Sequence, residues 1–237
     1  MGKLNGQIAL VTGASRGIGR AAALMLAREG AHVIAVARNV DALEGLDDAI
    51  KSSGVKDGAT LVPLDLRDHT GIGRLGQSIE ARWGRLDILV GNAAVLGPIT
   101  PLEHITPEKW RELLDVNVTA NWSLIRALSP LLRAASAGGR AVFITSGAAR
   151  SAKPFWGGYA MSKAALESLV KIWAAENVRT ALRINLFNPG ATRTGMRAAA
   201  IPGEDPMTLP TPETVAEALL PLLLPECGAT GEIVDFR

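Results

Sequence analysis

The only tyrosine of the chain, Tyr159, is followed four positions later by Lys163, and the two could perform acid–base chemistry. Residues 154–177 predict a helix in which these side chains lie one turn apart on the same face. A phenol with a pKa of ~10 is a poor base near neutrality, but a neighbouring cation favours the phenolate and lowers that pKa by ~1 to 3. Such a pair also occurs as an ordinary helix-surface pair, so the surrounding residues must decide.

Ser146 ends a short apolar run, residues 141–147, that predicts a strand. Its hydroxyl can donate a hydrogen bond to a carbonyl oxygen that gains charge as a hydride reaches the carbon. The alternative is a serine that caps a turn or a helix. Because Tyr159 follows it closely, we favour the first interpretation.

Three glycines, Gly13, Gly17 and Gly19, lie between the first predicted strand and a long helical pattern, in the sequence VTGASRGIGRAAALMLAREG. Glycines permit a tight turn and a close approach of the backbone, and the free amides at a helix N-terminus attract a pyrophosphate. The alternative is a glycine-rich turn without a ligand. The position directly after the first strand favours a dinucleotide.

The second predicted strand ends in Arg38, where an acidic residue would hold a free ribose 2′-hydroxyl. Arg38 and Arg16, which lies inside the glycine loop, could instead pair with a 2′-phosphate. Both arginines could also be ordinary solvated surface residues, and the absence of an acid is the firmer observation. The cofactor that this pattern predicts is NADP(H) rather than NAD(H).

Short apolar runs alternate with helical patterns along the chain, and this alternation predicts a parallel sheet. Most runs are continuously apolar, as expected for strands that helices bury on both faces. We therefore expect one Rossmann-type, doubly wound α/β domain over residues 1–237, with seven strands and the ligand at their carboxyl ends. The predicted strands are residues 8–14, 32–38, 60–66, 86–94, 141–147, 183–190 and 231–236, and helices are expected at 40–50, 72–83, 106–135, 154–177 and from 211.

The composition narrows the class of partner. The chain has 237 residues, of which 48% are hydrophobic and 20% charged, which suits one folded domain. A formal net charge of +2, with both signs interleaved, favours a small-molecule partner over nucleic acid or a membrane surface. One cysteine, no signal pattern and no apolar run of ~20 residues lead us to expect a cytoplasmic protein. The histidines do not cluster, so no metal is expected.

The combined motifs resemble those of the classical short-chain dehydrogenase/reductase family from about residue 6 to the end of the chain. The matching segments are TGASRGIG (12–19), NAA (92–94), Asn117, Ser146, Tyr159-x-x-x-Lys163 and NPGATRT (188–194). The resemblance implies that Tyr159 exchanges a proton with the substrate oxygen while Ser146 polarises it. It also implies that Lys163 lowers the pKa of Tyr159 and binds the nicotinamide ribose, and that Asn117 holds a water in a proton relay.

The same resemblance implies the residues of the cofactor site. Asp65 is assigned to the adenine, although it could simply cap a strand end. Ala94 stands where the family commonly has glycine, which adds a methyl group near the cofactor. The implied cofactor-binding residues are Gly13, Ser15, Arg16, Gly17, Ile18, Gly19, Arg38, Asp65, Leu66, Asn92, Ala93, Ala94, Tyr159, Lys163, Pro189, Gly190, Thr192 and Thr194.

The substrate side is less defined by sequence. Residues 195–210 are short and partly apolar where relatives often carry a helical lid. An apolar pocket is expected beside the reacting carbon, although its residues could equally belong to the core. Its candidate lining residues are Ala148, Phe155, Trp156, Ala191 and Met196.

We therefore expect an NADP(H)-dependent oxidoreductase that interconverts a carbonyl compound and an alcohol, mainly by reduction. Two alternatives are an epimerase or dehydratase of nucleotide sugars and a non-catalytic, dinucleotide-sensing regulator or scaffold. The helices that carry Asn117 and Tyr159 form subunit contacts in many relatives, which implies a homodimer or homotetramer. Trp110, Trp122 and Trp173 fall on these helices and could contribute to an interface or to the core.

Overall fold

The apolar runs of the sequence form one parallel sheet in the computed structural model, which describes residues 2–55 and 58–236. Within this part of the chain the sheet has seven strands in the order β3-β2-β1-β4-β5-β6-β7. The strands are β1 (Ile8–Thr12), β2 (His32–Ala37), β3 (Thr60–Pro63), β4 (Ile88–Gly91), β5 (Arg140–Ile144), β6 (Arg183–Asn188) and β7 (Ile233–Asp235).

The strand order reverses beside β1. The chain passes from β1 outward to β2 and β3, and then returns to place β4 on the other side of β1. Val11 of β1 consequently lies between Ala35 of β2 and Val90 of β4, with both neighbours parallel. This reversal makes a crevice at the carboxyl ends of the strands, which is where ligands bind in open α/β sheets. The prediction of a doubly wound, seven-stranded α/β fold is confirmed.

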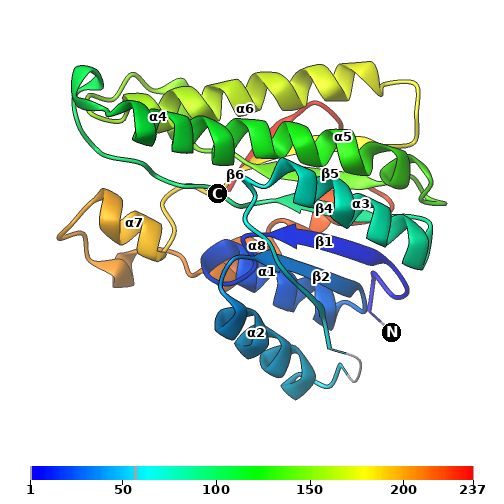
Figure 1. Ribbon diagram of the computed structural model, residues 1–237. Helices are drawn as coiled ribbons and strands as arrows, with labels where there is room; N and C mark the ends of the chain where they lie inside the picture. The colour runs from blue at the N-terminus through cyan, green and yellow to red at the C-terminus, as the bar shows by residue number, and fades with distance from the viewer. Residues whose placement is uncertain (1, 56–57, 237) are drawn as a thin grey trace.

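Helices cover both faces of the sheet (Figure 1). One face carries α1 (Gly17–Arg28), α2 (Val40–Ser52), α8 (Pro212–Glu217) and α9 (Leu220–Leu223). The other carries α3 (His69–Trp83), α4 (Pro107–Leu114), α5 (Ala120–Arg133) and α6 (Gly157–Glu176). Short 3-10 turns lie at η1 (Leu102–His104), η3 (Gly147–Arg150) and η4 (Pro206–Thr208). No helix of the described residues is long and apolar enough to cross a membrane.

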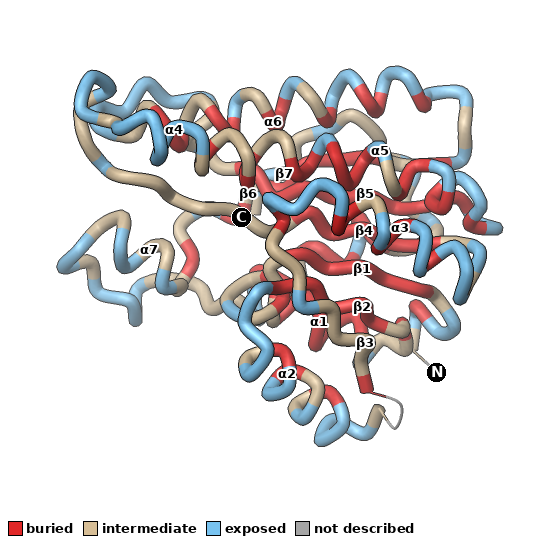
Figure 2. The backbone as a smooth tube through the Cα atoms, viewed as in Figure 1, coloured by how far each residue is buried: buried red, intermediate tan, exposed pale blue. Residues whose placement is uncertain are grey.

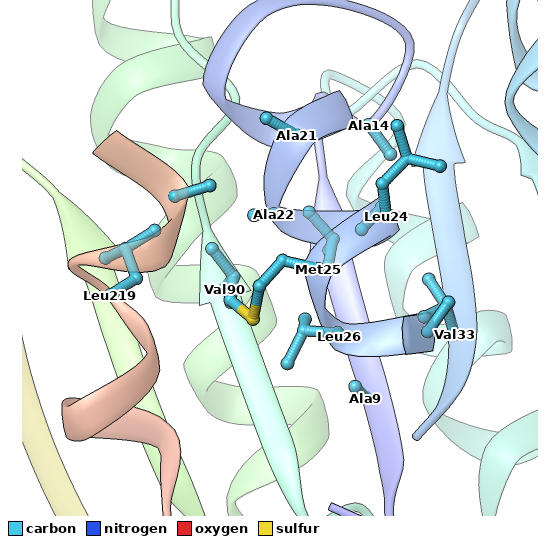
Figure 3. Close-up of a cluster of buried hydrophobic side chains, with 14 of the residues drawn as sticks. Ala9, Ala14, Ala21, Ala22, Leu24, Met25, Leu26, Val33, Val90 and Leu219 are labelled. Carbon is cyan, nitrogen blue, oxygen red and sulfur yellow. The ribbon is translucent and has the colours of Figure 1, made fainter. Parts of the chain in front are cut away.

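The two core layers share each strand between them. In β1, Ala9 and Val11 pack toward α1, while Ile8 and Leu10 pack toward α3 and α5. Successive side chains of a strand point to opposite faces, so both faces are buried and the run is apolar throughout. Figure 2 shows the resulting buried strands inside a shell of half-buried and exposed helices. Small alanines of α1 let this helix lie close to the sheet, as the close-up of the first layer shows (Figure 3).

The observed strands end earlier than the sequence predicted. The first run was expected over 8–14 and the fourth over 86–94, whereas β1 ends at Thr12 and β4 at Gly91. After these points the regular strand pairing ends: Gly13 has φ +66°, and the N–H of Asn92 donates to the side-chain hydroxyl of Thr12 instead of a backbone carbonyl of β1. The residues beyond the strand ends therefore belong to loops at the mouth of the crevice.

One long helix was predicted over 106–135, and the structure interrupts it. Helix α4 leads into a π-helical turn, η2 (Asp115–Thr119), before α5 continues the same rod. Asn117 lies in this turn and is fully buried. Single π-turns inside α-helices often mark functional sites, because the wider turn changes where a side chain or carbonyl points. Helical periodicity alone does not reveal such an insertion.

Candidate functional site

The sequence-predicted residues gather around one cavity of about 430 Å³ at the carboxyl ends of the strands. The helix that carries Tyr159, the loop after β5 and the glycine loop after β1 all reach it. Of the predicted residues, its walls include Gly13, Ser15, Arg16, Gly17, Ile18, Arg38, Asp65, Leu66, Asn92, Ala93, Ala94, Ser146, Trp156, Tyr159, Lys163, Pro189, Gly190, Thr192, Thr194 and Met196.

Tyr159 lies in the first turn of α6 and faces Ser146, which follows β5. Both side chains line the cavity, Tyr159 is buried, and Ser146 Oγ accepts from the Ala148 N–H at 3.2 Å while its hydroxyl also acts on the phenol. Burial raises the pKa of Tyr159 to about 12, because the phenolate would lose its hydration, and the hydrogen bond with Ser146 opposes this only in part. In this structure the direction is opposite to the expected lowering by Lys163. Burial dominates, and the Lys163 ammonium group lies 5.9 Å from the centre of the Tyr159 ring.

Lys163 lies one turn further along α6 and is only 2% exposed. Its Nζ donates to the carbonyl of Ile144 at 2.7 Å, at the end of β5. Burial lowers the pKa of Lys163 to about 8, and the Glu167 carboxylate on the next turn opposes this. Glu167 is itself buried and accepts a hydrogen bond from Thr145 Oγ1 at 2.8 Å. The sequence analysis did not single out Glu167, although its i+4 spacing after Lys163 is a visible signal.

Asn117 joins the loop after β4 to α6 by side-chain hydrogen bonds. Its Oδ1 accepts from the Val95 N–H at 2.8 Å, and its Nδ2 donates to the Val95 carbonyl and to Ser162 Oγ, each at 2.9 Å. Ser162 Oγ donates in turn to the carbonyl of Tyr159. Asn117 is not part of the cavity wall, but it fixes the elements that are.

The glycine loop is shaped so that a ligand can approach its backbone. Gly13 has a left-handed conformation, and a Cβ there would lie 2.8 Å from Nδ2 of Asn92. That amide is fixed by its hydrogen bond to the Thr12 carbonyl at 2.9 Å. Gly19 lies behind the wall rather than in it, because a Cβ at this position would overlap Asn92 and the Gly13 carbonyl. No side chain caps the N-terminus of α1, so its first amides are available toward the cavity.

Charged side chains surround the cavity where β2 and β3 end. Arg38 follows β2, and its side chain is 59% exposed and lies 4.0 Å from the Asp65 carboxylate. Asp65 is paired more closely with Arg67, at 2.5 Å, and this hydrogen bond is the main cause that lowers the pKa of Asp65 to about 2. Arg67 was not predicted from sequence. It offsets the negative charge of Asp65, so this end of the cavity stays cationic with Arg16 and Arg38.

The apolar end of the cavity differs in part from the expectation. Trp156 and Met196 contribute to its wall, but Ala148, Phe155 and Ala191 do not. Phe155, which precedes the wall residue Trp156, has φ +71°, in the left-handed region, and is 56% exposed. The wall residues that sequence did not identify there are Val95, Leu96, Val116, Arg193, Arg197 and Ala200.

The described residues contain no group of three or more His, Cys, Asp or Glu side chains that could hold a metal ion. Two of the histidines have polar partners outside the site. His32 Nε2 lies 2.8 Å from Thr60 Oγ1, and His69 Nδ1 lies 3.3 Å from Ser123 Oγ. The polar side chains on the cavity wall are hydroxyl, phenol, ammonium, guanidinium, carboxylate and amide groups.

Known proteins share this arrangement. The family model described as "short chain dehydrogenase" matches residues 7–205. An uncharacterized oxidoreductase of Escherichia coli (strain K12), YciK, is 40% identical over 222 residues, which are 93% of this chain and 87% of that protein. An uncharacterized NAD-dependent oxidoreductase of Mycobacterium tuberculosis (strain ATCC 25618 / H37Rv) is 36% identical over 206 residues, 82% of this chain and 74% of that protein.

Solved structures agree in backbone as well as in sequence. The crystal structure of a short chain dehydrogenase from Escherichia coli CFT073, complexed with NADPH, superposes with a TM-score of 0.92 at 39% identity. The match covers 98% of this chain and 97% of that one.

Proposed function

This chain belongs to the classical short-chain dehydrogenase/reductase family of oxidoreductases, and we propose that it reduces a carbonyl compound to an alcohol with NADPH. The observation that carries the proposal is the convergence of Ser146, Tyr159 and the buried Lys163 at one cavity. A hydrogen-bond donor, a proton donor and a fixed cation are what a carbonyl oxygen needs as it becomes an alkoxide.

The residues present fit a nicotinamide dinucleotide. The left-handed Gly13 and the uncapped N-terminus of α1 form a cradle that an added Cβ would fill. In the sheet, β2 lies three positions from β5. At about 4.8 Å per strand, roughly 14 Å separates Arg38 from the Ser146 region, a length that suits an extended dinucleotide. When bound, such a cofactor supplies the hydride.

Two arginines support the preference for a phosphorylated cofactor. Arg16 and Arg38 line the cavity, and Arg67 offsets the carboxylate of Asp65, which lies 4.0 Å from Arg38. A 2′-phosphate at this end would meet guanidinium groups rather than an acid. The NADPH complex of the similar Escherichia coli CFT073 protein agrees with this preference, although the Mycobacterium tuberculosis relative is named as NAD-dependent.

The protein groups divide the proton chemistry between them. With a pKa of about 12, the phenol of Tyr159 stays protonated near neutral pH, which suits a proton donor and therefore reduction. Ser146 donates a hydrogen bond to the substrate oxygen that Tyr159 protonates. Lys163, with a pKa of about 8, keeps most of its charge at neutral pH. This charge stabilises the phenolate that Tyr159 becomes when it gives its proton to the substrate oxygen. Asn117 fixes the Val95 loop and α6, and we propose a water-mediated proton relay from Lys163 past this residue.

The assembly belongs to the same proposal. We propose a cytoplasmic homodimer or homotetramer in which residues 1–237 form one domain that includes the substrate site. Trp110 and Trp122 support a contact through α4 and α5, since they are 37% and 47% exposed. Trp173 does not, because it is buried edge-on against Phe143 with 6.1 Å between ring centres. Size-exclusion chromatography with light scattering tests this, and a monomer would contradict it.

The proposed function is tested by titrating the purified protein with NADPH and with NADH, and then by a panel of ketones and aldehydes. We expect tighter binding of NADPH and its oxidation by at least one carbonyl compound of the panel. Binding without turnover would favour the dinucleotide-sensing regulator instead. Tighter binding of NADH would contradict the interpretation of Arg16 and Arg38.

A further inference from the structure

The charges on the cavity wall are distributed unevenly between its two ends. The cationic wall residues are Arg16, Arg38, Lys163, Arg193 and Arg197. Arg16 and Arg38 lie at the ends of β1 and β2, away from Tyr159. Lys163 donates to Ile144 and lies beneath the phenol. Among the described wall residues, Arg193 and Arg197 remain as cations that could receive an acidic group of a substrate, so their own partners decide whether such a group can bind. The exposed Lys153 is not part of the wall, but its Nζ lies 4.7 Å from the centre of the Trp156 ring.

Arg197 already has a carboxylate partner. It lies in α7 (Gly195–Ala200), and its Nε and a terminal nitrogen donate to the two oxygens of Glu204, each at 2.6 Å. This bidentate geometry is the one in which a guanidinium binds a carboxylate most strongly. Both side chains are about three-quarters buried, with exposed fractions of 26% and 24%. A substrate carboxylate would therefore have to displace Glu204 to use Arg197.

Arg193 supports residues 195–210, the lid segment, which carries the ion pair of Arg197 and Glu204. Its Nε donates to the Pro206 carbonyl at 2.7 Å and a terminal nitrogen to the Leu209 carbonyl at 3.2 Å. Its backbone N–H donates to the carbonyl of Pro210 at 2.9 Å, which closes the base of the segment. In Figure 1, α7 and the segment that follows it lie beyond the carboxyl ends of the strands, on the side to which the arrow of β1 points. The guanidinium group of Arg193 is thus directed along the lid.

The remaining wall beside the reacting groups is apolar. It consists of Val95, Leu96, Val116, Trp156, Met196 and Ala200. The apolar character continues on the two loops that adjoin the wall residues Leu96 and Trp156, where the Thr100 N–H donates to the Phe155 carbonyl at 3.0 Å and joins the loops. Phe155, Ile99 and Leu102 on these loops are 56%, 37% and 61% exposed. Burial of a charge among such groups without a partner is unfavourable, whereas apolar groups are stabilised there.

We propose that the substrate is an uncharged, predominantly apolar carbonyl compound, and that Glu204 excludes acidic substrates by keeping Arg197 in an ion pair. This inference rests on the proposed reductase function and defines its substrate class. Glu204 acts as a specificity-determining residue rather than a catalytic one, since it touches Arg197 and not the reacting groups. The apolar mouth at Ile99, Leu102 and Phe155 receives the part of the substrate that extends out of the cavity.

The test uses two ketones that differ only in charge, methyl 4-acetylbenzoate and 4-acetylbenzoate, with NADPH. We expect kcat/KM to be at least about tenfold higher for the ester, because Glu204 holds the Arg197 guanidinium and backbone carbonyls hold that of Arg193. In Glu204→Gln the ester-to-acid ratio should fall by about threefold or more, since Arg197 is then released to pair with the acid. The intrinsic reactivities of the two ketones cancel when the ratios of two proteins are compared. Glu217→Gln, an exposed glutamate on α8, is the matched control and should leave the ratio unchanged.

The binding of each compound to the protein saturated with NADP⁺, measured by calorimetry, gives a second readout that is independent of turnover. We expect the ester to bind more tightly than the acid, and the ratio of the two affinities to fall in Glu204→Gln. Equal use and equal binding of acid and ester by the wild-type protein would overturn the inference, and so would a ratio that Glu204→Gln leaves unchanged. Failure of the reductase function itself is distinguishable, because NADPH would then remain unoxidised with every carbonyl compound tried.

Discussion

Lys163→Met isolates the contribution of one buried charge to the proposed proton transfer. Methionine is similar in length, fits a buried position and removes the ammonium group. In the wild-type protein, Nζ lies 5.9 Å from the centre of the Tyr159 ring. With the ring centre taken as the position of the phenolate charge and an effective dielectric constant of about 20, the attraction is about 3 kcal/mol. If it is realised fully in the transition state, its loss slows turnover by about a hundredfold.

The pH dependence of kcat for NADPH-dependent reduction gives the same contribution independently. Below about pH 8 the Lys163 ammonium is present in the wild-type protein, and it is lost as the pH rises through about 8. Tyr159, with a pKa of about 12, does not titrate in that range. We therefore expect wild-type kcat to fall through about pH 8 toward the rate of Lys163→Met, and the rate of the variant to stay flat there.

Two controls separate this charge effect from damage to the fold. Lys171→Met removes an exposed ammonium of the same helix and should leave both the rate and the profile unchanged. Thermal unfolding of Lys163→Met measures the cost of the Ile144 carbonyl that loses its donor. A loss of less than about fivefold in a folded variant, or the same alkaline decline without the lysine, would refute the electrostatic reasoning.

Three further substitutions test the parts that position the chemistry. Arg38→Asp should weaken NADPH binding by at least about tenfold and change NADH binding much less, because it adds repulsion toward a 2′-phosphate. Fluorescence titration measures both affinities, and an unchanged preference would show that another residue binds that phosphate. Gly13→Ala should destabilise the loop by about 1–2 kcal/mol, since its φ is +66° and the methyl group would lie 2.8 Å from Asn92; calorimetric stability and NADPH affinity should fall together, and normal affinity would contradict the cradle. Asn117→Ala removes three buried side-chain hydrogen bonds and should lower the free energy of unfolding by about 3 kcal/mol in urea; a loss below about 1 kcal/mol would argue against its role as a support.

Local sequence patterns were sufficient for the fold and for the glycine loop, the arginines and the catalytic side chains, whereas the family resemblance implied most of the other wall residues that were predicted. Glycines after the first strand, an arginine after the second and a serine after the fifth converge because the carboxyl ends of parallel strands share one edge. Tyr159 and Lys163 are four residues apart, and helical periodicity alone predicts that they lie on the same face.

Features that depend on tertiary placement could not be predicted in this way. The π-turn at Asn117 lies inside a continuous helical pattern, and a one-residue change in winding leaves no compositional sign. Phe155 was expected inside the pocket, but it is not part of the wall, has a left-handed backbone and is 56% exposed. The pairing of Arg197 with Glu204 spans a loop whose path is set by Arg193, so neither partner stands out from the sequence. The pKa of Tyr159 depends on burial, which local spacing does not give.

The most direct test of the account is a single-turnover measurement of NADPH oxidation by the wild-type protein and by Tyr159→Phe, with an uncharged ketone that the wild type reduces. The account predicts that Tyr159→Phe binds NADPH with nearly unchanged affinity but loses turnover by at least about a thousandfold, because the proton donor is missing while Ser146 and Lys163 remain. Turnover within about tenfold of the wild-type rate would contradict the role assigned to Tyr159.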